Sequence, residues 1–345
     1  MAGSRTPSVR ESGATTPLTG QGSSTPLPPL DKSGHQGNYS EEQTKILLDF
    51  EQQLKQEDCL KDDYLFETPD QIHIVLGRYL RARNWNIENA KKMYKDTLNW
   101  RKEVNIDQMV KPKEEGGYDF EEREKIGELG WKMYFHSTDK YHRPIFVQDL
   151  SYLQVHEVFQ NTTPDRIVKF FALSLEDAVR NKYRACTQLA REEARKQGAT
   201  EEEVSRIIVD DNFMILNVAG LGMSTFWSFK NKLQELLAIL DANYPELSGR
   251  VQIINAPWLF TTIWSYIKGW LPPATAAKID IAGTDYHSIL FKYIDPNEFP
   301  EYMGGKCKCE GCTGGCPFSN RGPWNDKKNT TSETKVTNGE AIQST

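Results

Sequence analysis

Apolar residues recur with helical spacing in three segments near the start of the chain. Ile46, Leu47, Phe50 and Leu54 share one stripe, and the preceding Ser40-Glu-Glu-Gln forms a capping box. A second helix is predicted to begin at Thr68-Pro69, which combines a cap residue with a proline in the first turn, and a third follows Asn86. These segments predict a helical N-terminal subdomain over residues 39–112.

The pattern changes after residue 113. Short apolar runs at 132–136 and 144–149 predict two strands joined by a turn, and a long helix is predicted after Thr163-Pro164. Predicted strands at 212–218, 250–255 and 278–282 then alternate with predicted helices at 226–240 and 258–270. Such alternation is typical of βαβ units, so we predict an α/β fold over residues 113–325, with a mostly parallel sheet flanked by helices.

The two ends of the chain lack periodic apolar residues. Residues 1–38 are rich in Ser, Thr, Pro and Gly, which predicts a disordered tail, and residues 326–345 predict a loose polar tail. Thr6, Thr16 and Thr25 each precede a proline and are either kinase sites or part of an unregulated solvated tail. The first residues contain no apolar segment, and no run of apolar residues is long enough to span a bilayer. We therefore expect a cytoplasmic protein whose contact with membranes is peripheral and reversible.

Composition and motifs exclude several function classes. The net charge is −6 and no dense Lys/Arg cluster is present, which argues against nucleic-acid binding. No G-x-G-x-x-G follows a strand, and the phosphate-binding loop G-x-x-x-x-G-K-[ST] and the nucleophile elbow G-x-S-x-G are both absent. His136 lies in a predicted strand, where we interpret it as a hydrogen-bonded core histidine. We expect no enzyme activity and no cofactor, with a hydrolase or phosphatase of unrecognised site as the alternative.

Four cysteines lie close together near the end of the predicted domain. Cys307, Cys309, Cys312 and Cys316 have the spacing C-x-C-x2-C-x3-C and resemble a structural zinc site. The four cysteines are so close in the sequence that one short loop is poorly suited to place all four thiols around a tetrahedral ion. We therefore favour a reduced, Gly-rich connector and expect no metal, with zinc as the alternative.

Three of the eight tryptophans fall in one short segment, residues 258–271. Its apolar side chains surround the predicted helix on nearly every side: Trp258, Phe260, Ile263, Trp264, Ile267, Trp270 and Leu271. Such a helix is either fully buried or faces something apolar that is not protein, and Trp is favoured at membrane interfaces. The second interpretation predicts a gate helix over an apolar cavity that holds acyl chains.

Several short motifs occur in a characteristic order between residues 40 and 325. They are Leu80-Arg81-Ala82-Arg83 with Trp100-Arg101, His136-Ser-Thr-Asp139, Arg143-Pro144-Ile145, Asn217-Val-Ala-Gly220-Leu, Asn243-Tyr244-Pro245-Glu246, Ile253-Ile254-Asn255-Ala256-Pro257 and Phe299-Pro-Glu-Tyr-Met-Gly-Gly305. In this order they resemble the CRAL-TRIO lipid-binding family, in particular its branch of Sec-fourteen-like phosphatidylinositol transfer proteins. The resemblance covers nearly all of the chain between the two polar tails.

The resemblance implies a bound phospholipid, with acyl chains over the sheet and a gate helix that opens at membranes. It also implies that four side chains hold the inositol headgroup: Arg83, Glu246, Thr275 and Lys278. Lys278 can neutralise a phosphodiester, and Glu246 can accept hydrogen bonds from ring hydroxyls. The alternative for Arg83 and Glu246 is an ion pair between the two subdomains.

One departure from the branch concerns lipid selectivity. A Ser-x-Thr pair that the branch uses to hold phosphatidylcholine is replaced here by Asn212 and Met214. We therefore expect phosphatidylinositol binding more than phosphatidylcholine exchange. A charged insert near residues 191–203 is expected to be a solvated helix extension.

Together these features predict a monomer that transfers phosphatidylinositol between membranes and presents it to inositol-lipid kinases, with Golgi or endosomal membranes as the expected site. The alternatives are a carrier of another hydrophobic ligand, such as a tocopherol, retinoid or sterol, and a sensor that holds lipid without net transfer.

Overall fold

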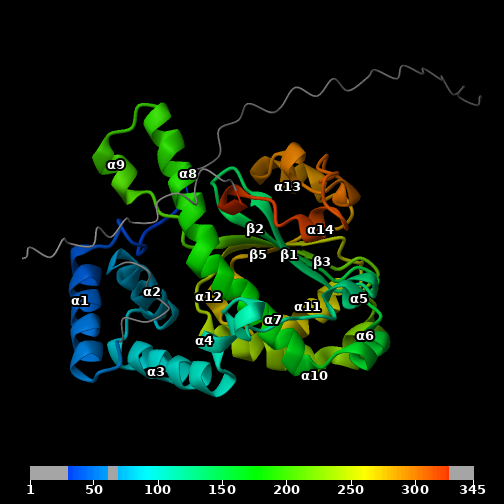
Figure 1. Ribbon diagram of the computed structural model, residues 1–345, viewed down its shortest axis with the longest axis horizontal. Helices are drawn as coiled ribbons and strands as arrows, with labels where there is room; N and C mark the ends of the chain where they lie inside the picture. The colour runs from blue at the N-terminus through cyan, green and yellow to red at the C-terminus, as the bar shows by residue number, and fades with distance from the viewer. Residues whose placement is uncertain (1–29, 61–68, 326–345) are drawn as a thin grey trace, which may run out of the picture. The chain divides into compact units, whose positions relative to one another are not determined.

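A computed structural model describes residues 30–60 and 69–325 of the chain. The predictions for residues 1–29 and 326–345, including the three Thr-Pro sites, lie outside the described residues. The α-helices and strands follow in chain order (Figure 1): α1 (Glu41–Gln56), α2 (Pro69–Ala82), α3 (Ile87–Val104), α4 (Ile106–Met109), α5 (Arg123–Glu128), β1 (Lys132–Thr138), β2 (Pro144–Asp149), α6 (Val155–Asn161), α7 (Pro164–Asp177), α8 (Tyr183–Lys196), α9 (Glu201–Arg206), β3 (Asn212–Asn217), α10 (Met223–Asn243), β4 (Ser248–Ile254), α11 (Phe260–Lys268), α12 (Pro273–Ala276), β5 (Ile279–Ile281), α13 (His287–Tyr293) and α14 (Cys316–Ser319).

Five strands form one sheet in the order β1-β2-β3-β4-β5. The β1–β2 pair is antiparallel and the other three pairs are parallel, as the alternating pattern predicted. The β1–β2 connection is held by Arg143, whose Nε donates to Asp139 Oδ2 over 2.8 Å within a buried ion pair. The predicted α/β fold with a mostly parallel sheet is confirmed.

Both faces of the sheet are covered by helices, which explains why its strands are apolar on both sides. Alternate residues of one strand point to opposite faces, so Phe146 joins the cluster that contains α7, α10 and α11, whereas Ile145 and Val147 join the cluster under α13. Figure 1 shows α7, α10 and α11 below the sheet and α13 and α14 above it.

The N-terminal helices pack around a separate apolar cluster. Leu47, Phe50 and Leu54 of α1 meet the buried residues of α2 and α3 there, and the ring of Tyr94 contacts both Phe50 and Tyr79 edge to face. The predicted capping box is present, since Gln43 N donates to Ser40 Oγ over 3.1 Å. This cluster explains the apolar stripes that the sequence displays near its start.

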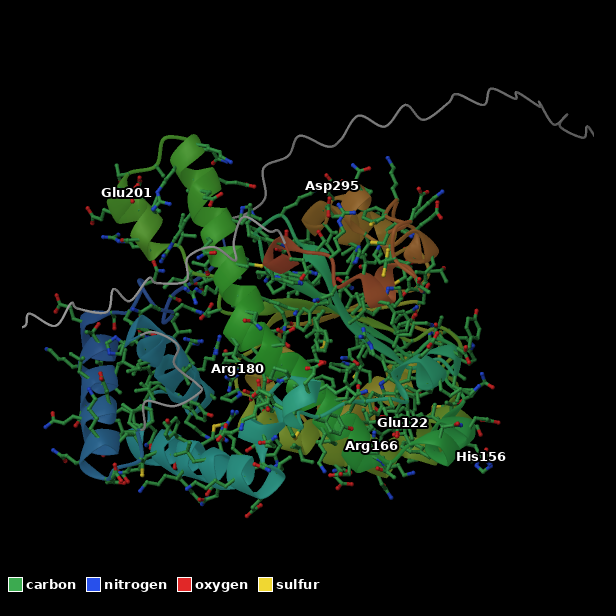
Figure 2. All side chains as sticks on the ribbon, viewed as in Figure 1. Glu122, His156, Arg166, Arg180, Glu201 and Asp295 are labelled. Atoms are coloured by element: carbon green, nitrogen blue, oxygen red, sulfur yellow. The ribbon has the colours of Figure 1, made fainter. Side chains whose placement is uncertain are left out.

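A buried ion pair joins α3 to α7. Arg101 Nη2 donates to Glu176 Oε2 over 3.1 Å, and Tyr244 Oη donates to Glu176 Oε1 over 3.0 Å. The pairing compensates for the cost of burying the carboxylate. At the other end of α7, Arg166 Nη2 donates to Glu122 Oε2 over 2.7 Å, a pair labelled in Figure 2. That pair is partly exposed, so it contributes only about 0–1 kcal/mol to the stability of the fold.

The predicted long helix after Thr163-Pro164 is present but not uniform. Thr163 Oγ1 accepts from Arg166 N, and α7 continues through one π-helical turn, Ala178–Lys182, into α8. The charged insert forms a helical hairpin of α8 and α9, closed by an Arg195–Glu201 ion pair and a capping box at Thr200. The expectation of a solvated helix extension is therefore refined to a hairpin.

Part of the segment assigned to the disordered tail is packed. Lys32 Nζ lies 3.1 Å from Asp210 Oδ1 and 2.8 Å from Asp211 Oδ2, both on the loop before β3. Residues 31–38 are therefore corrected to an ordered segment, because two buried carboxylates need a cation that their own loop does not provide.

Candidate functional site

Three of the four residues predicted to hold a headgroup lie close together beside β5. Glu246 is in the loop between α10 and β4, and Lys278 lies between α12 and β5. Lys278 Nζ donates to Glu246 Oε2 over 2.8 Å, with exposed side-chain fractions of 28% and 15%. Lys278 N donates to Thr275 O over 3.1 Å, which places Thr275 in the same turn. The result is a partly buried cluster with both a cation and a carboxylate available to a polar ligand.

The arginine nearest to Glu246 is Arg81, not the predicted Arg83. Arg81 Nε lies 3.9 Å from Glu246 Oε2, whereas Arg83 Nη1 donates to Ala82 O over 2.9 Å. Arg83 acts electrostatically on Asp241, where it opposes the rise in pKa that burial causes. The alternative of an Arg83–Glu246 ion pair is thus wrong, since Arg81 takes that place, while the role of Arg83 at a headgroup stays a prediction. Arg81 lies one helical turn after Arg78, so both face the loop before β3, whereas Arg83 lies beyond the end of α2.

Arg81 belongs to a buried ionic network that was not predicted from the sequence. Its Nη2 lies 3.7 Å from Asp210 Oδ2, and His35 Nδ1 lies 2.8 Å from the same oxygen. Burial by itself raises the pKa of Asp210, but Lys32, His35 and Arg81 outweigh it and hold that pKa well below its usual value. The sequence signal was the carboxylate pair Asp210-Asp211 directly before an apolar strand. The network connects the segment 31–38, α2 and the Glu246–Lys278 pair.

The Trp-rich segment forms a shorter helix than predicted and is not apolar on every side. The helix α11 begins only at Phe260. Residues 257–260 before it form a separate turn, in which Phe260 N donates to Pro257 O over 2.8 Å. Phe260 and Ile263 are buried, and three predicted residues pack partly buried against the same cluster: Trp264, Ile267 and Trp270. The outward face carries Thr261, Thr262, Ser265 and Lys268. The prediction of an all-round apolar helix is wrong because its small polar residues share one face.

Large apolar side chains are nevertheless exposed around α11. Trp258 precedes the helix and is 84% exposed, and Leu259 and Tyr266 are also exposed. Tyr266 contacts the exposed Trp227 of α10 edge to face at 5.1 Å between ring centroids. Lys230 Nζ lies 5.0 Å from the Trp227 ring centroid, within cation–π range. Exposed aromatics with a nearby cation are suited to the interfacial region of a bilayer.

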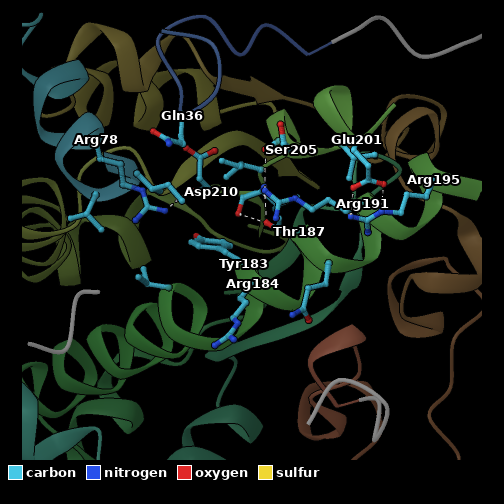
Figure 3. Close-up of a pocket in the computed structure, with 17 residues that line it drawn as sticks. Gln36, Arg78, Tyr183, Arg184, Thr187, Arg191, Arg195, Glu201, Ser205 and Asp210 are labelled. Carbon is cyan, nitrogen blue, oxygen red and sulfur yellow. Dashed lines mark hydrogen bonds and ion pairs between the residues drawn. The ribbon is translucent and has the colours of Figure 1, made fainter. Parts of the chain in front are cut away.

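Two pockets of the described residues lie away from α11. One of about 560 Å³ is bounded by α2, α8 and α9 (Figure 3), and its arginines are paired, for example Arg191 with Ile207 O and Arg195 with Glu201. A second of about 420 Å³ lies between α7 and β1. Neither is lined by a residue of α11. The predicted apolar cavity under the gate is not among these pockets, because Phe260 and Ile263 pack against protein side chains.

Three of the four clustered cysteines meet a histidine from a distant strand. Cys307, Cys309, Cys316 and His136 each offer a ligand atom, and these atoms lie within 4.8 Å of one another. Cys312 is outside this group. His136 is buried as expected, but its Nε2 has no hydrogen-bond partner in the described part of the chain, so it is not a satisfied core histidine. Burial and the nearby Arg321 charge lower the pKa of His136 to about 4, which leaves the imidazole neutral.

Comparison with known proteins places this architecture in a family. Residues 129–305 match the model described as the CRAL/TRIO domain, and residues 46–96 match the CRAL/TRIO N-terminal domain. The chain belongs to the CRAL/TRIO family, which confirms the resemblance found in the sequence. The solved structure described as "Crystal structure of Sfh5" superposes with a TM-score of 0.52 over 74% of this chain and 85% of that chain. At 15% identity that likeness supports the fold alone.

Two curated relatives carry names that bear on function. The chain is 34% identical over 266 residues to phosphatidylinositol/phosphatidylcholine transfer protein SFH7 of Arabidopsis thaliana, covering 77% of this chain and 44% of that protein. It is 30% identical over 254 residues to the Sec14 cytosolic factor of Schizosaccharomyces pombe, covering 74% of this chain and 80% of that protein. The chain spans about half the length of the plant relatives SFH7 and SFH12.

None of the helices in the described ranges combines the length and the apolarity needed to cross a bilayer.

Proposed function

We propose that this protein binds one phospholipid, phosphatidylinositol, and transfers it between membranes without chemical change to the lipid. The observation that carries the proposal is the Lys278–Glu246 pair at the edge of the sheet, with Thr275 in the same turn. The names of the relatives as phosphatidylinositol/phosphatidylcholine transfer proteins support the same ligand class.

The chemistry of the pair fits an inositol phospholipid. An ammonium group has three donors, so Lys278 can keep its bond to Glu246 and still bind a phosphodiester oxygen. A carboxylate accepts several hydrogen bonds, so Glu246 can accept from ring hydroxyls at the same time. Hydrogen bonds to charged groups are about twice as strong as neutral ones, which gives the headgroup contacts a large share of the selectivity.

Uptake of lipid requires α11 to move. Phe260 and Ile263 are buried in the cluster beside the sheet, so acyl chains can reach this region only if the helix swings outward. Its exposed neighbours Trp258 and Tyr266 can then enter the bilayer interface, which offsets the loss of packing inside the protein. Each methylene gains about 0.8 kcal/mol on leaving water, but the bilayer already shelters the chains, so transfer is close to balanced.

The residues of β3 favour phosphatidylinositol over phosphatidylcholine. Met214 stands where the resemblance expects a threonine, and a thioether cannot donate a hydrogen bond to a phosphate. Asn212 is fully buried, and its Nδ2 donates to Tyr183 Oη over 3.2 Å. Neither position offers the hydroxyl group of the Ser-x-Thr pair.

The proposal extends to the setting in which the protein acts. A monomer that meets Golgi or endosomal membranes from the cytoplasm, reversibly and at their surface, would present its lipid to inositol-lipid kinases there. The exposed aromatics around α11 support a peripheral contact of this kind. Addition of the protein to vesicles should then raise the rate at which such a kinase phosphorylates phosphatidylinositol, and an unchanged rate would remove the kinase part of the proposal.

Native mass spectrometry of the full chain tests the ligand directly, because the mass of the co-purifying molecule identifies its class. We expect phosphatidylinositol, and transfer of labelled phosphatidylinositol between vesicles faster than that of phosphatidylcholine. A co-purifying tocopherol, retinoid or sterol would replace the proposal with a different carrier. Bound phosphatidylinositol without transfer would make the protein a sensor, and no uptake of any lipid would end the proposal.

A further inference from the structure

A largely buried group of three thiols and one imidazole, of which only Cys309 is half-buried, lies outside the proposed lipid site. Cys307, Cys309 and Cys316 come from the segment after α13, and His136 comes from β1, more than 150 residues earlier in the chain. We propose that these four side chains bind one zinc ion in a closed Cys3His site that fixes the C-terminal segment to the sheet. This site is independent of the lipid ligand.

The backbone before the first cysteine is shaped to bring it to the sheet. Gly304 has φ +84°, and a side chain at Gly305 would place its Cβ 2.0 Å from Phe299 O, so glycine is required at this close approach. The chain turns back, and Cys307 N donates to Phe299 O over 2.9 Å. Cys309 then adopts φ +47°, which returns its thiol toward Cys307.

The spacing of the donor atoms fits a tetrahedral ion. Zn–S bonds of about 2.3 Å at tetrahedral angles give sulfur–sulfur separations of about 3.8 Å. Cys307 Sγ and Cys309 Sγ lie 3.5 Å apart, and all four donor atoms are within 4.8 Å of one another. Four protein ligands leave no position for a substrate or water, so the site is structural and not catalytic.

The groups around the four ligands support the same assignment. His136 Nδ1 lies 3.3 Å from Ser319 Oγ, while the buried Nε2 has no hydrogen-bond partner among the described residues. Arg321 Nη1 donates to Cys307 Sγ over 2.9 Å. Three thiolates and one Zn²⁺ carry a net charge of −1, which the guanidinium can offset. Such outer contacts orient metal ligands and tune their affinity.

Cys312 supplies an internal control, because it belongs to the same loop but not to the donor group. Its Sγ lies 3.5 Å from Thr313 O, and the residue is half-buried. One short loop cannot easily place all four closely spaced thiols around a tetrahedral ion. In the fold, His136 and not Cys312 lies in the fourth ligand position. The effective ligand pattern is C-x-C-x6-C plus a distant histidine.

The segment held by this site has little other structure. The helix α14 has four residues, and the segment is linked to β1 by the hydrogen bond from Ser137 N to Arg321 O, over 2.6 Å, and by the edge-to-face contact of Trp324 with Phe135. Short elements of this kind seldom bury enough apolar surface to hold themselves in place, and a structural metal contributes the missing free energy.

The test is metal analysis of the full chain, purified under reducing conditions without chelator from zinc-supplemented culture. We expect about one equivalent of zinc in the wild type and in Cys312→Ser, since a structural site has one ion. Cys309→Ser should release zinc to a chromogenic chelator at least about tenfold faster, since loss of a ligand weakens a site by more than loss of an outer contact does. Cobalt substitution should give tetrahedral d–d and thiolate charge-transfer bands in the wild type and Cys312→Ser only.

His136→Asn provides a second variant from a different strand, and circular dichroism checks that each variant folds. Less than a tenth of an equivalent of zinc in the reduced, zinc-loaded wild type would overturn the proposal. So would equal zinc retention by Cys309→Ser and Cys312→Ser, or a different metal in the stoichiometric position.

Discussion

Lys278 Nζ lies 2.8 Å from Glu246 Oε2, although the two residues are 32 positions apart in the sequence. Glu246 has φ +60°, an uncommon conformation for a residue with a side chain, and the turn it forms after α10 brings its carboxylate toward β5. The pair is partly buried but open to solvent on one side, so its groups remain available to a ligand. The first prediction depends on this geometry.

Replacement of Lys278 by alanine should lower phosphatidylinositol transfer between vesicles by at least about tenfold. A hydrogen bond between charged groups contributes about 1.5–3 kcal/mol, and about 1.4 kcal/mol corresponds to a factor of ten. The midpoint of urea unfolding should change little because the pair is partly solvated. Lys292→Ala on α13, an exposed lysine across the sheet, is the matched control. Equal transfer by both variants would contradict the assignment of Lys278.

Replacing the two arginines of the Leu-Arg-Ala-Arg motif one at a time should have different effects: Arg81 on the stability of the fold, and Arg83 on lipid transfer. Arg81 is 10% exposed between Asp210 and Glu246, so Arg81→Met removes one cation from each carboxylate and should lower the free energy of unfolding by about 2 kcal/mol. The loss is partial because Asp210 keeps Lys32 and His35, and Glu246 keeps Lys278. Arg83→Met should cost less than about 0.5 kcal/mol but reduce phosphatidylinositol transfer. Urea unfolding and vesicle transfer measure the two effects. A large loss of stability in Arg83→Met would contradict this division.

The ionic network at Asp210 predicts a dependence of stability on pH. The pKa of Asp210 is held below its unfolded value of about 3.9, so its stabilisation is complete above that pH and is lost as the pH falls toward the folded-state pKa. Asp210→Asn should therefore cost about 3 kcal/mol at pH 7 and progressively less below about pH 4. Urea midpoints of wild type and variant between pH 7 and pH 3 measure the difference.

Asp49→Asn, on the exposed face of α1, is the control for that measurement and should cost less than about 0.5 kcal/mol at either pH. If the difference in the free energy of unfolding between wild type and Asp210→Asn stays constant from pH 7 to pH 3, the carboxylate does not stabilise the fold through its charge.

Replacement of Trp258 tests whether the region around α11 contacts membranes, and it leaves the core undisturbed. Its side chain is 84% exposed, so Trp258→Ala should leave the unfolding midpoint unchanged. It should weaken binding to vesicles by about tenfold or more, because burial of a large apolar side chain contributes about 1.5–3 kcal/mol and about 1.4 kcal/mol corresponds to a factor of ten. Co-sedimentation with phospholipid vesicles measures the affinity, and transfer should slow in parallel. Leu48→Ala, an exposed apolar residue of α1, is the control. Trp264→Glu is less informative, because Trp264 packs against the core and its replacement also destabilises the fold.

Local patterns in the sequence were sufficient for the architecture. Helical spacing of apolar residues predicted α1, and the capping box at Ser40 fixed where that helix begins. The apolar runs before and after Thr163-Pro164 predicted the strands of the sheet and the helices α7, α10 and α11 that cover one of its faces, whereas α13 on the other face was not predicted. These features depend on neighbours within a few residues, which the order of amino acids specifies directly.

The tertiary structure decided which distant side chains meet. Spacing within Leu80-Arg83 could not show that Arg81, and not Arg83, turns toward Glu246, because that depends on where α2 ends and on its rotation against the loop before β3. The cysteine spacing could not reveal His136, which reaches the thiols only after β1 enters the sheet beside the C-terminal segment. The inward face of α11 was likewise set by packing on the sheet. Contacts between residues far apart in the chain follow from the packing of whole elements, which local periodicity does not encode.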